Sequence, residues 1–203
     1  MGSSTTADST GTRQALVEAA GVALRDKGFG GASARAVAAE AGMNQALIFY
    51  HFGSVTNLLL AALDATSRQR MDEYAKAVEA ASNLAELVEA AAGVFNQDLA
   101  GGHISVLAEM IAGASSVPGL GPEIAARMAP WIDFTEAAIR KGIGTGPLAS
   151  LVPASDAAYA VVALYLGIEM LAHLDGDRTQ AESLFATARR LVALMNAFTG
   201  GTQ

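Results

Sequence analysis

Apolar residues recur at every third or fourth position along most of the chain, which is the pattern of amphipathic helices. In the first third, the run Gly28-Phe29-Gly30-Gly31 ends one such pattern, and Ser33 and Asn44 can cap two short ones. The elements predicted there are Thr12–Lys27, Ala34–Glu40, a helix from Asn44 to about Tyr50, and a long connecting helix from Thr56 to Ala81.

Five more amphipathic segments follow, separated by breakers rich in glycine, proline and aspartate. The predicted helices are Asn83–Leu99, Ile104–Ala112, Pro122–Lys141, Ser155–Leu174 and Thr179–Phe198. Abundant alanine favours helices, because alanine loses no side-chain entropy in a helix and offers little to pack in a strand. The sequence therefore predicts an all-α fold, with three helices at the amino terminus joined by a long helix to a helical body.

Composition narrows the class of protein. With 203 residues, 52% of them hydrophobic, 16% charged, and a mean hydropathy of +0.33, the chain is not globally disordered. It contains no cysteine, which excludes disulfides, thiolate zinc sites and a cysteine nucleophile, and suits a reducing cytoplasm. We expect neither a signal peptide nor a membrane-spanning helix, because no uncharged apolar run reaches about 18 residues.

The net charge of −7 is unevenly distributed. Basic and acidic residues balance in the first 60 positions, so the whole acidic excess lies downstream. An acidic chain does not favour unspecific binding to polyanions, but specific binding needs only one surface of suitable charge. This neutral amino-terminal part followed by an acidic body suggests two separate roles.

Three residues in the two short helices have the spacing of a helix-turn-helix. Ala38 is followed by Gly42 four positions later and by Ile48 six positions after that. Two helices that cross steeply over a tight turn need a small residue where they touch and a residue that tolerates positive φ in the turn. They also need an apolar residue on the second helix, so the pattern fits this motif.

The segments Ser33–Asn44 and Ile48–Phe52, together with Leu58, resemble the DNA-binding head of the TetR/AcrR family of transcriptional regulators. The resemblance covers roughly residues 12–63. The rest of the chain is similar only in size, helicity and helix order, except that 164–177 looks like the penultimate helix of actinobacterial-type members. The resemblance implies a DNA-binding helix-turn-helix head and a helical body that binds a ligand and dimerises.

Two positions depart from the family pattern. Val55-Thr56 stands where the family usually has Lys-Glu, whose lysine neutralises a phosphate, so one expected backbone contact is missing. Met43-Asn44 stands where valine and serine are usual, and Asn44 can cap equally well. Losing one phosphate contact should lower the salt dependence of binding by about one unit and leave base reading unchanged.

By the same resemblance, the second short helix lies in the major groove with its first residues nearest the bases. Gln45 can pair with adenine, Ala46 can contact a thymine methyl group, and Asn44 either caps the helix or reads a base. Tyr50, His51 and Thr56 are expected at phosphates. The predicted DNA-binding set is Arg13, Ser33, Ala34, Arg35, Asn44, Gln45, Ala46, Tyr50, His51 and Thr56.

Some of these residues have an alternative role. Ser33 caps a helix first and contacts phosphate second, and Arg35 contacts either a base or a phosphate. Arg13 either follows the DNA backbone from a flexible arm or is simply solvated. The aromatic and apolar residues of this region are expected to anchor the core of the head; they are Phe29, Ile48, Phe49 and Phe52.

The body shows no catalytic motif, so the sequence predicts neither an enzyme nor a cofactor or metal. Glu169 and His173 are one helical turn apart and form half of a metal site, a ligand-facing polar pair or an interface pair. The glycines of 142–146 superficially resemble a phosphate-binding loop, but no strand precedes them, and a plain loop is expected.

Large adaptable side chains in the body are either ordinary core or the lining of a site for a small hydrophobic effector. The candidates are Phe95, Met110, Met128, Trp131, Phe134, Tyr159, Tyr165 and Glu169. By the resemblance, the last two helices pack against those of a second copy. Their apolar faces suit this contact and contain Ala157, Ala160, Val161, Leu164, Ile168, Leu171, Leu184, Ala188, Leu191, Val192 and Met195.

The sequence thus predicts a flexible tail at 1–11, a helix-turn-helix DNA-binding domain at 12–60, and a ligand-binding and dimerisation domain at 61–199. The expected function is that of a cytoplasmic, homodimeric repressor that a hydrophobic effector releases from a palindromic operator, with the connecting helix as the pivot. Two alternatives stay open: a transcriptional activator, and an all-α ligand-binding or enzymatic protein whose head serves contact with other proteins.

Overall fold

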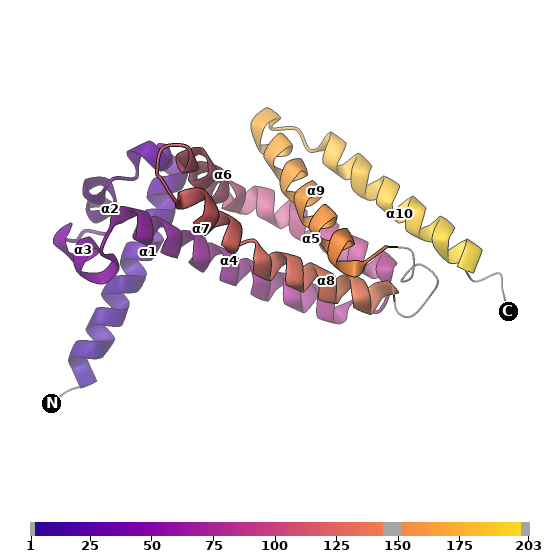
Figure 1. Ribbon diagram of the computed structural model, residues 1–203, viewed down its shortest axis with the longest axis horizontal. Helices are drawn as coiled ribbons and strands as arrows, with labels where there is room; N and C mark the ends of the chain where they lie inside the picture. Colours follow the sequence, from indigo (N-terminus) through magenta and orange to yellow (C-terminus); the bar gives the residue numbers. More distant parts are fainter. Residues whose placement is uncertain (1–2, 144–151, 200–203) are drawn as a thin grey trace. The chain divides into compact units, whose positions relative to one another are not determined.

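The computed structural model describes residues 3–143 and 152–199, and within these ranges all regular structure is helical (Figure 1). The expectation of an all-α fold is therefore confirmed. The helices are α1 Ser3–Gly31, α2 Ala34–Glu40, α3 Ala46–Phe52, α4 Val55–Ala80, α5 Leu84–Gly101, α6 His103–Ala114, α7 Leu120–Ala126, α8 Ala129–Ile143, α9 Ala154–Asp175 and α10 Thr179–Thr199.

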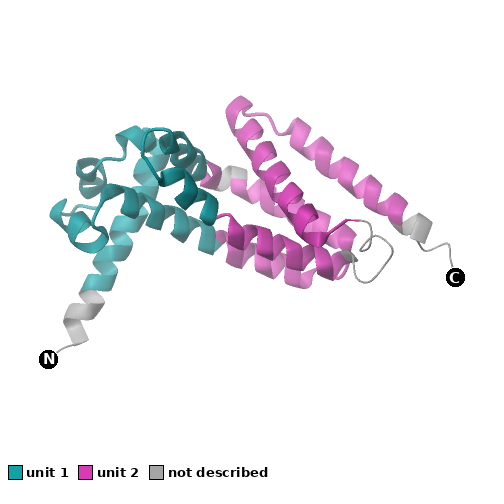
Figure 2. Ribbon diagram, in the orientation of Figure 1, with its two compact units in different colours: residues 1–69, 105–126 teal, residues 70–104, 127–203 magenta. Residues whose placement is uncertain are grey.

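The chain forms two compact units (Figure 2). Unit 1 comprises the residues up to Gln69 and the segment Ser105–Ala126; unit 2 comprises Arg70–Ile104 and the residues from Arg127 onward. The helix α4 is continuous and contributes to both units, as the predicted connecting helix required. The sequence predicted DNA binding for residues 12–60, and ligand binding with dimerisation for residues 61–199. These two roles stay predictions.

The first helix begins earlier than its sequence pattern indicated. It was expected from Thr12, after a flexible tail, but α1 already begins at Ser3. The segment 3–11 contains no proline and one glycine, so nothing in it stops a helix that the following residues have already nucleated. The predicted end is confirmed, because Gly28 breaks the helical geometry with φ 70 and ψ 174.

Unit 1 has a core built from one face of each of its first helices. Ser33 caps α2 as predicted, its side chain accepting from the Ala36 N–H at 3.3 Å. The apolar side chains that meet inside the unit are those of Leu16, Ala20, Leu24, Val37, Ala38, Ile48, Phe52, Leu58, Leu59 and Ala62. This core positions α3 at the surface of the unit.

Helix α6 is tied to the kink of α1 inside unit 1. The Glu109 carboxylate accepts a hydrogen bond from the Phe29 N–H at 2.8 Å, which satisfies an amide that the positive φ of Gly28 removes from the helical ladder. The Phe29 ring lies directly against Gly113, where any Cβ would clash with it. The contact therefore depends on glycine at both positions.

Unit 2 consists of α5, α8, α9 and α10 with the last turns of α4. Helix α8 packs on α9, and α5 packs on α8, α9 and α10. The start of α5 is capped: the Asn83 side chain accepts from the Glu86 N–H at 3.0 Å, and Glu86 accepts from the Ser82 N–H at 2.6 Å. At the end of α4, Lys141 donates to the Val78 carbonyl at 3.0 Å.

One predicted helix is wrong. The segment Pro122–Lys141 was expected to be continuous, but α7 ends at Ala126 and α8 begins at Ala129. Pro130 gives the reason, because a proline ring clashes with the carbonyl four residues earlier, which is that of Ala126. Proline is tolerated in the first turn of a helix, where it now lies. A loop was expected at 142–146, but residues 142 and 143 continue α8; the rest of that segment lies outside the described residues.

The last two helices carry many exposed apolar side chains. They are Tyr159, Val161, Leu164, Leu171 and Leu174 on α9, and Leu184, Leu191 and Leu194 on α10. Two members of the predicted dimerisation faces turn inward instead: Val192 is buried, and Ile168 packs on the core around Phe95. Helix α9 is also long and apolar enough to cross a membrane, although it includes acidic residues.

Candidate functional site

The turn between α2 and α3 has the geometry that its sequence spacing predicted. Gly42 has a φ of 64°, where only glycine is free of strain, and Ala38 and Ile48 are both buried. The Met43 N–H donates to the Ala38 carbonyl at 2.9 Å and closes the turn. The helix-turn-helix arrangement of these elements is therefore present in unit 1.

Helix α3 begins two residues later than expected, at Ala46. The Asn44 side chain accepts a hydrogen bond from the Ala46 N–H at 2.9 Å, so of its two open roles it performs the local one in this structure. Gln45 occupies the cap position but makes no capping hydrogen bond with its side chain. Its amide is exposed and can pair with a base edge.

The ten residues predicted to contact DNA all lie in unit 1, and most are exposed. Tyr50 is the most exposed of the large apolar side chains, because its ring is 81% exposed on a short helix and buries almost none of its apolar area. The exposed members are Arg13, Ser33, Arg35, Asn44, Gln45, Ala46 and Tyr50; the half-buried ones are Ala34, His51 and Thr56.

Two expectations for this surface need correction. Arg13 was placed on a flexible arm, but it lies within α1, and its guanidinium stacks over the Phe52 ring at 4.9 Å from the centroid. Phe49 was expected in the core, but its side chain is 51% exposed. Ile48 and Phe52 share the inner face of α3 because they are four residues apart, which turns Phe49 outward.

The start of α4 is held against the end of α3. Ser54 Oγ accepts from the Asn57 N–H at 3.1 Å, and the Asn57 amide donates to the Phe52 carbonyl at 2.9 Å. Val55 opens the helix, and Thr56 is half-buried behind it. The contact of Thr56 with a phosphate stays a prediction.

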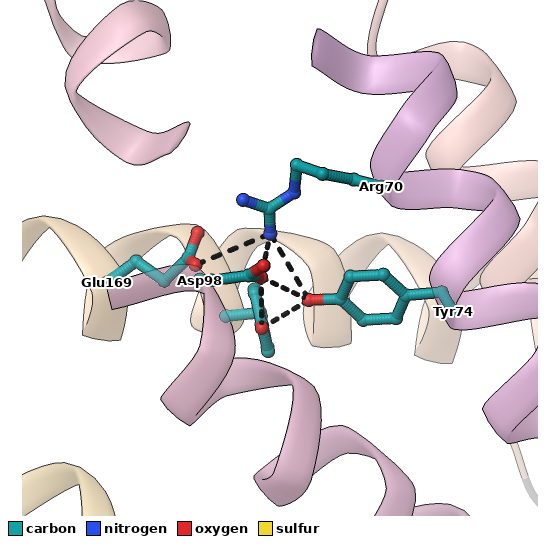
Figure 3. Close-up of polar contacts among 5 residues, drawn as sticks. Arg70, Tyr74, Asp98 and Glu169 are labelled. Atoms are coloured by element: carbon teal, nitrogen blue, oxygen red, sulfur yellow. Dashed lines mark hydrogen bonds and ion pairs between the residues drawn. The ribbon is translucent and has the colours of Figure 1, made fainter. Parts of the chain in front are cut away.

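Unit 2 contains a buried polar network that joins three helices (Figure 3). We use this name for Arg70 and Tyr74 of α4, Asp98 of α5, and Tyr165 and Glu169 of α9. Arg70 forms an ion pair with Asp98, and its Nη2 lies 3.6 Å from Glu169 Oε1. These three charged side chains are all buried, so their attraction acts with little screening by water.

The two tyrosines complete the surroundings of Asp98. Its Oδ2 accepts from the Tyr74 hydroxyl at 2.7 Å and from the Tyr165 hydroxyl at 2.9 Å, and the two hydroxyls contact each other. Burial raises the pKa of both phenols, so they stay protonated and act as donors. With Arg70 and two hydroxyls around it, Asp98 is fully satisfied.

Glu169 is not satisfied in the same way. Its side chain is almost fully buried, and among the described residues Oε1 has no hydrogen-bond partner. Burial raises the pKa of Glu169 to about 7, and the nearby Arg70 charge offsets only part of this effect. The carboxyl group therefore changes its charge close to neutral pH.

This shift predicts a pH dependence of stability. The folded protein holds the Glu169 proton more tightly than the unfolded chain, in which the pKa of this carboxyl group is 4.5. The stability that protonated Glu169 contributes to the fold is therefore complete below pH 4.5 and is lost as pH rises through about 7. Relative to Glu169→Gln, the wild type should lose up to about 3 kcal/mol of unfolding free energy between about pH 5 and pH 8. Urea unfolding of both proteins at each pH measures the difference; parallel pH profiles would contradict it.

Aromatic rings from five helices lie within and around the polar network. This aromatic cluster consists of Tyr74, Phe95, Trp131, Phe134, Tyr165 and Phe185. Tyr74 lies edge-on to Trp131 at 5.5 Å and to Tyr165 at 6.0 Å between centroids, and Phe95 lies 5.8 Å from Tyr165. Phe95 is fully buried, whereas the other five rings are half-buried.

The structure brings together five of the eight residues predicted to face a ligand: Phe95, Trp131, Phe134, Tyr165 and Glu169. It separates the others. Tyr159 is 65% exposed on α9, and Met110 is buried in unit 1 rather than in unit 2. Met128 lies in the break before α8. Helical spacing alone does not show which face of α9 or α6 is turned inward, which is why Tyr159 and Met110 were grouped with the rest.

Sequence reasoning missed Arg70, Tyr74, Asp98 and Phe185. A signal was available for the first three, because Arg70 and Tyr74 continue the spacing of the buried Leu59 and Leu63, and Asp98 continues that of Val94. A charged residue on the apolar face of a helix indicates a buried ion pair, because a buried charge needs a partner. Glu169 has that partner in Arg70, whereas His173 is exposed; the described residues contain no group suited to a metal ion.

The chain resembles known regulators in sequence and in fold. Residues 16–62 match the bacterial regulatory proteins of the tetR family, whereas no curated protein matches the chain. The fold is similar to a TetR-family transcriptional regulator from Cytophaga hutchinsonii, with a TM-score of 0.77, 19% identity, and coverage of 92% of this chain and 95% of that one.

Two further structures show the same likeness. The regulatory protein TetR from Rhodobacter sphaeroides has a TM-score of 0.72 at 16% identity, covering 87% of this chain and 96% of that one. FadR from Bacillus subtilis, solved in complex with stearoyl-CoA, has a TM-score of 0.73 at 13% identity, covering 88% and 96%. At these identities the likeness is one of fold.

Proposed function

We propose that this chain, whose amino-terminal part belongs to the tetR family of bacterial regulatory proteins, is a homodimeric repressor that a small hydrophobic effector releases from a palindromic operator in the cytoplasm. The observation that carries the proposal is the surface of α3. Gln45 at the cap position and Tyr50 within the helix are both exposed, directly after a tight glycine turn. A regulator needs such side chains outside, since they must reach the bases and phosphates.

On the operator, α3 enters the major groove. Gln45 pairs with a base and Ala46 contacts a thymine methyl, while Tyr50 and His51 reach the phosphates beside the groove. Two heads of a dimer contact half-sites about 34–36 Å apart, one turn of the double helix. The balanced charge of the first 60 residues makes binding depend on these specific contacts more than on unspecific attraction.

The apolar residues exposed on α9 and α10 support the dimer. Exposed apolar side chains in this number on two helices are unusual on a monomer and usual at an interface between identical subunits. Two copies that bury these helices against each other form a four-helix contact with twofold symmetry. The same contact explains why α9 is apolar enough to resemble a membrane span.

The aromatic cluster and the polar network are the proposed effector site. Binding there has to favour one spacing of the two heads, and a coupling of about 1–3 kcal/mol changes operator occupancy roughly 5- to 150-fold. Helix α4 carries Arg70 and Tyr74 of this site and begins directly after α3, which makes it the proposed pivot. Activation instead of repression requires the same contacts and differs only in the position of the operator.

A protein-binding head is the second candidate, and Val55 with the balanced charge of the head favours it, because both lower the attraction to phosphates. The variant Gln45→Ala separates the two functions. For a regulator it should weaken binding to duplexes selected from a random pool by about 5- to 150-fold, the value of one bidentate base contact. Fluorescence anisotropy measures this; Gln180→Ala, an exposed glutamine of α10, is the matched control. If wild-type protein selects no sequence from the pool, the DNA-binding function is wrong.

A further inference from the structure

Glu169 leaves one acceptor of unit 2 without a donor. Its Oε1 is buried and lacks a hydrogen bond among the described residues. Arg70, the nearest cation, stays 3.6 Å away, beyond hydrogen-bond length, because it is paired with Asp98. A buried acceptor without a donor is costly, so the site favours any molecule that brings an N–H or O–H group to this oxygen.

The charges of the network indicate which kind of donor fits. Arg70 and Asp98 neutralise each other, so the ionised Glu169 leaves one uncompensated negative charge. One positive charge on a ligand would balance the site, and a second carboxylate would add to the excess. A neutral hydroxyl would satisfy the hydrogen bond and leave the charge uncompensated. Charge balance therefore selects a monocation.

The rings around the network favour the same class of ligand. Faces of tryptophan, tyrosine and phenylalanine attract cations and also bury hydrocarbon. Trp131, Phe134 and Tyr74 are half-buried, so part of each ring is accessible from outside the core. A ligand with an apolar chain and a charged end can contact these rings and Glu169 together.

We propose that the effector site takes a protonated hydrophobic amine, whose ammonium group donates to Glu169 Oε1 while its hydrocarbon packs on Trp131 and Phe134. The proposal rests on the proposed function only in assigning this ligand the role of effector. The stearoyl-CoA bound by FadR of Bacillus subtilis is an anion. Such a ligand would lie beside two carboxylates here, with the one arginine already paired.

The test uses the full chain and three probes of equal length: n-octylamine, 1-octanol and octanoate. Trp131 is the single tryptophan of the chain and lies in the aromatic cluster, so its fluorescence reports binding. At about pH 8, where Glu169 is largely ionised and an amine is still protonated, octylamine should bind about 10-fold or more tightly than octanol. Octanoate should bind most weakly.

The variant Glu169→Gln assigns the preference to this carboxylate. It should lower the affinity for octylamine to that for octanol and leave octanol unchanged, whereas Glu182→Gln on the exposed side of α10 should change neither. Equal affinities in the wild type, a preference for octanoate, or a preference for octylamine that survives Glu169→Gln would each overturn the proposal.

A second measurement does not depend on the folding of the variant. In the wild type, the preference for octylamine should fall as pH drops through about 7, because Glu169 takes up a proton while both tyrosine hydroxyls, whose pKa burial raises, stay protonated and Asp98 stays paired with Arg70. A constant preference would contradict the assignment. These titrations contain no DNA, so their result does not depend on operator binding. If octylamine binds but does not release the operator, only the role of the amine as effector is wrong.

Discussion

Replacing Arg70 with methionine is expected to lower the free energy of unfolding by about 3–5 kcal/mol. Arg70 is the single cation of the buried polar network, and its removal leaves Asp98 and Glu169 as two buried carboxyl groups without a counter-charge. The two tyrosine hydroxyls still donate to Asp98, but they cannot balance its charge. Urea unfolding followed by circular dichroism measures the loss.

Arg140→Met is the matched control for this experiment. Arg140 also pairs with a glutamate, Glu136, but on the exposed surface of α8, where a salt bridge one helical turn apart contributes about 0.3–0.5 kcal/mol. The double variant Arg70→Met, Glu169→Gln should recover part of the loss, since one of the stranded charges is then absent. Equal destabilisation by Arg70→Met and Arg140→Met would show that the network does not contribute to stability.

The double variant Leu164→Glu, Leu191→Glu is expected to convert the proposed dimer into monomers. The two side chains are 59% and 56% exposed on α9 and α10, so the changes should not disturb the fold of one copy. In a symmetric interface each glutamate occurs twice, and four carboxylates would then be desolvated without partners. Because one head contacts one half-site, operator affinity should fall by about 100-fold or more.

Light scattering coupled to size exclusion gives the mass, and anisotropy with the selected duplex gives the affinity. The control is Ile111→Glu, the same change at an exposed apolar position of α6, which should alter neither quantity. A wild-type protein that is monomeric at concentrations well above its operator affinity would refute the dimer. A double variant that stays dimeric would move the interface away from α9 and α10.

The helix-turn-helix could be predicted in detail because each of its determinants is local. The spacing of Ala38, Gly42 and Ile48 set the turn, and the cap at Ser33 marked a helix start that the structure confirms. The errors in this part concern direction on a helix. Phe49 and Ile48 are adjacent and both apolar, and only packing against the rest of unit 1 decides that Ile48 is the buried one.

The candidate effector site was predicted less completely. Trp131, Phe134, Tyr165 and Glu169 were expected to face a ligand because of their type, and the structure gathers them. Tyr159 has the same type but is 65% exposed on α9. Pro130 shows that a signal can be present and overlooked: its clash with the Ala126 carbonyl separates α7 from α8.

The amino-acid sequence by itself determined the all-α character of the chain, the glycine break near the end of α1, the tight turn before α3, and the exposed polar character of Gln45. These properties arise from interactions between residues at most about four positions apart, so the sequence shows both partners directly. Only the tertiary structure decided that Arg70, Asp98 and Glu169 meet. Their helices are distant in the sequence, and burial makes each of these charges depend on the others.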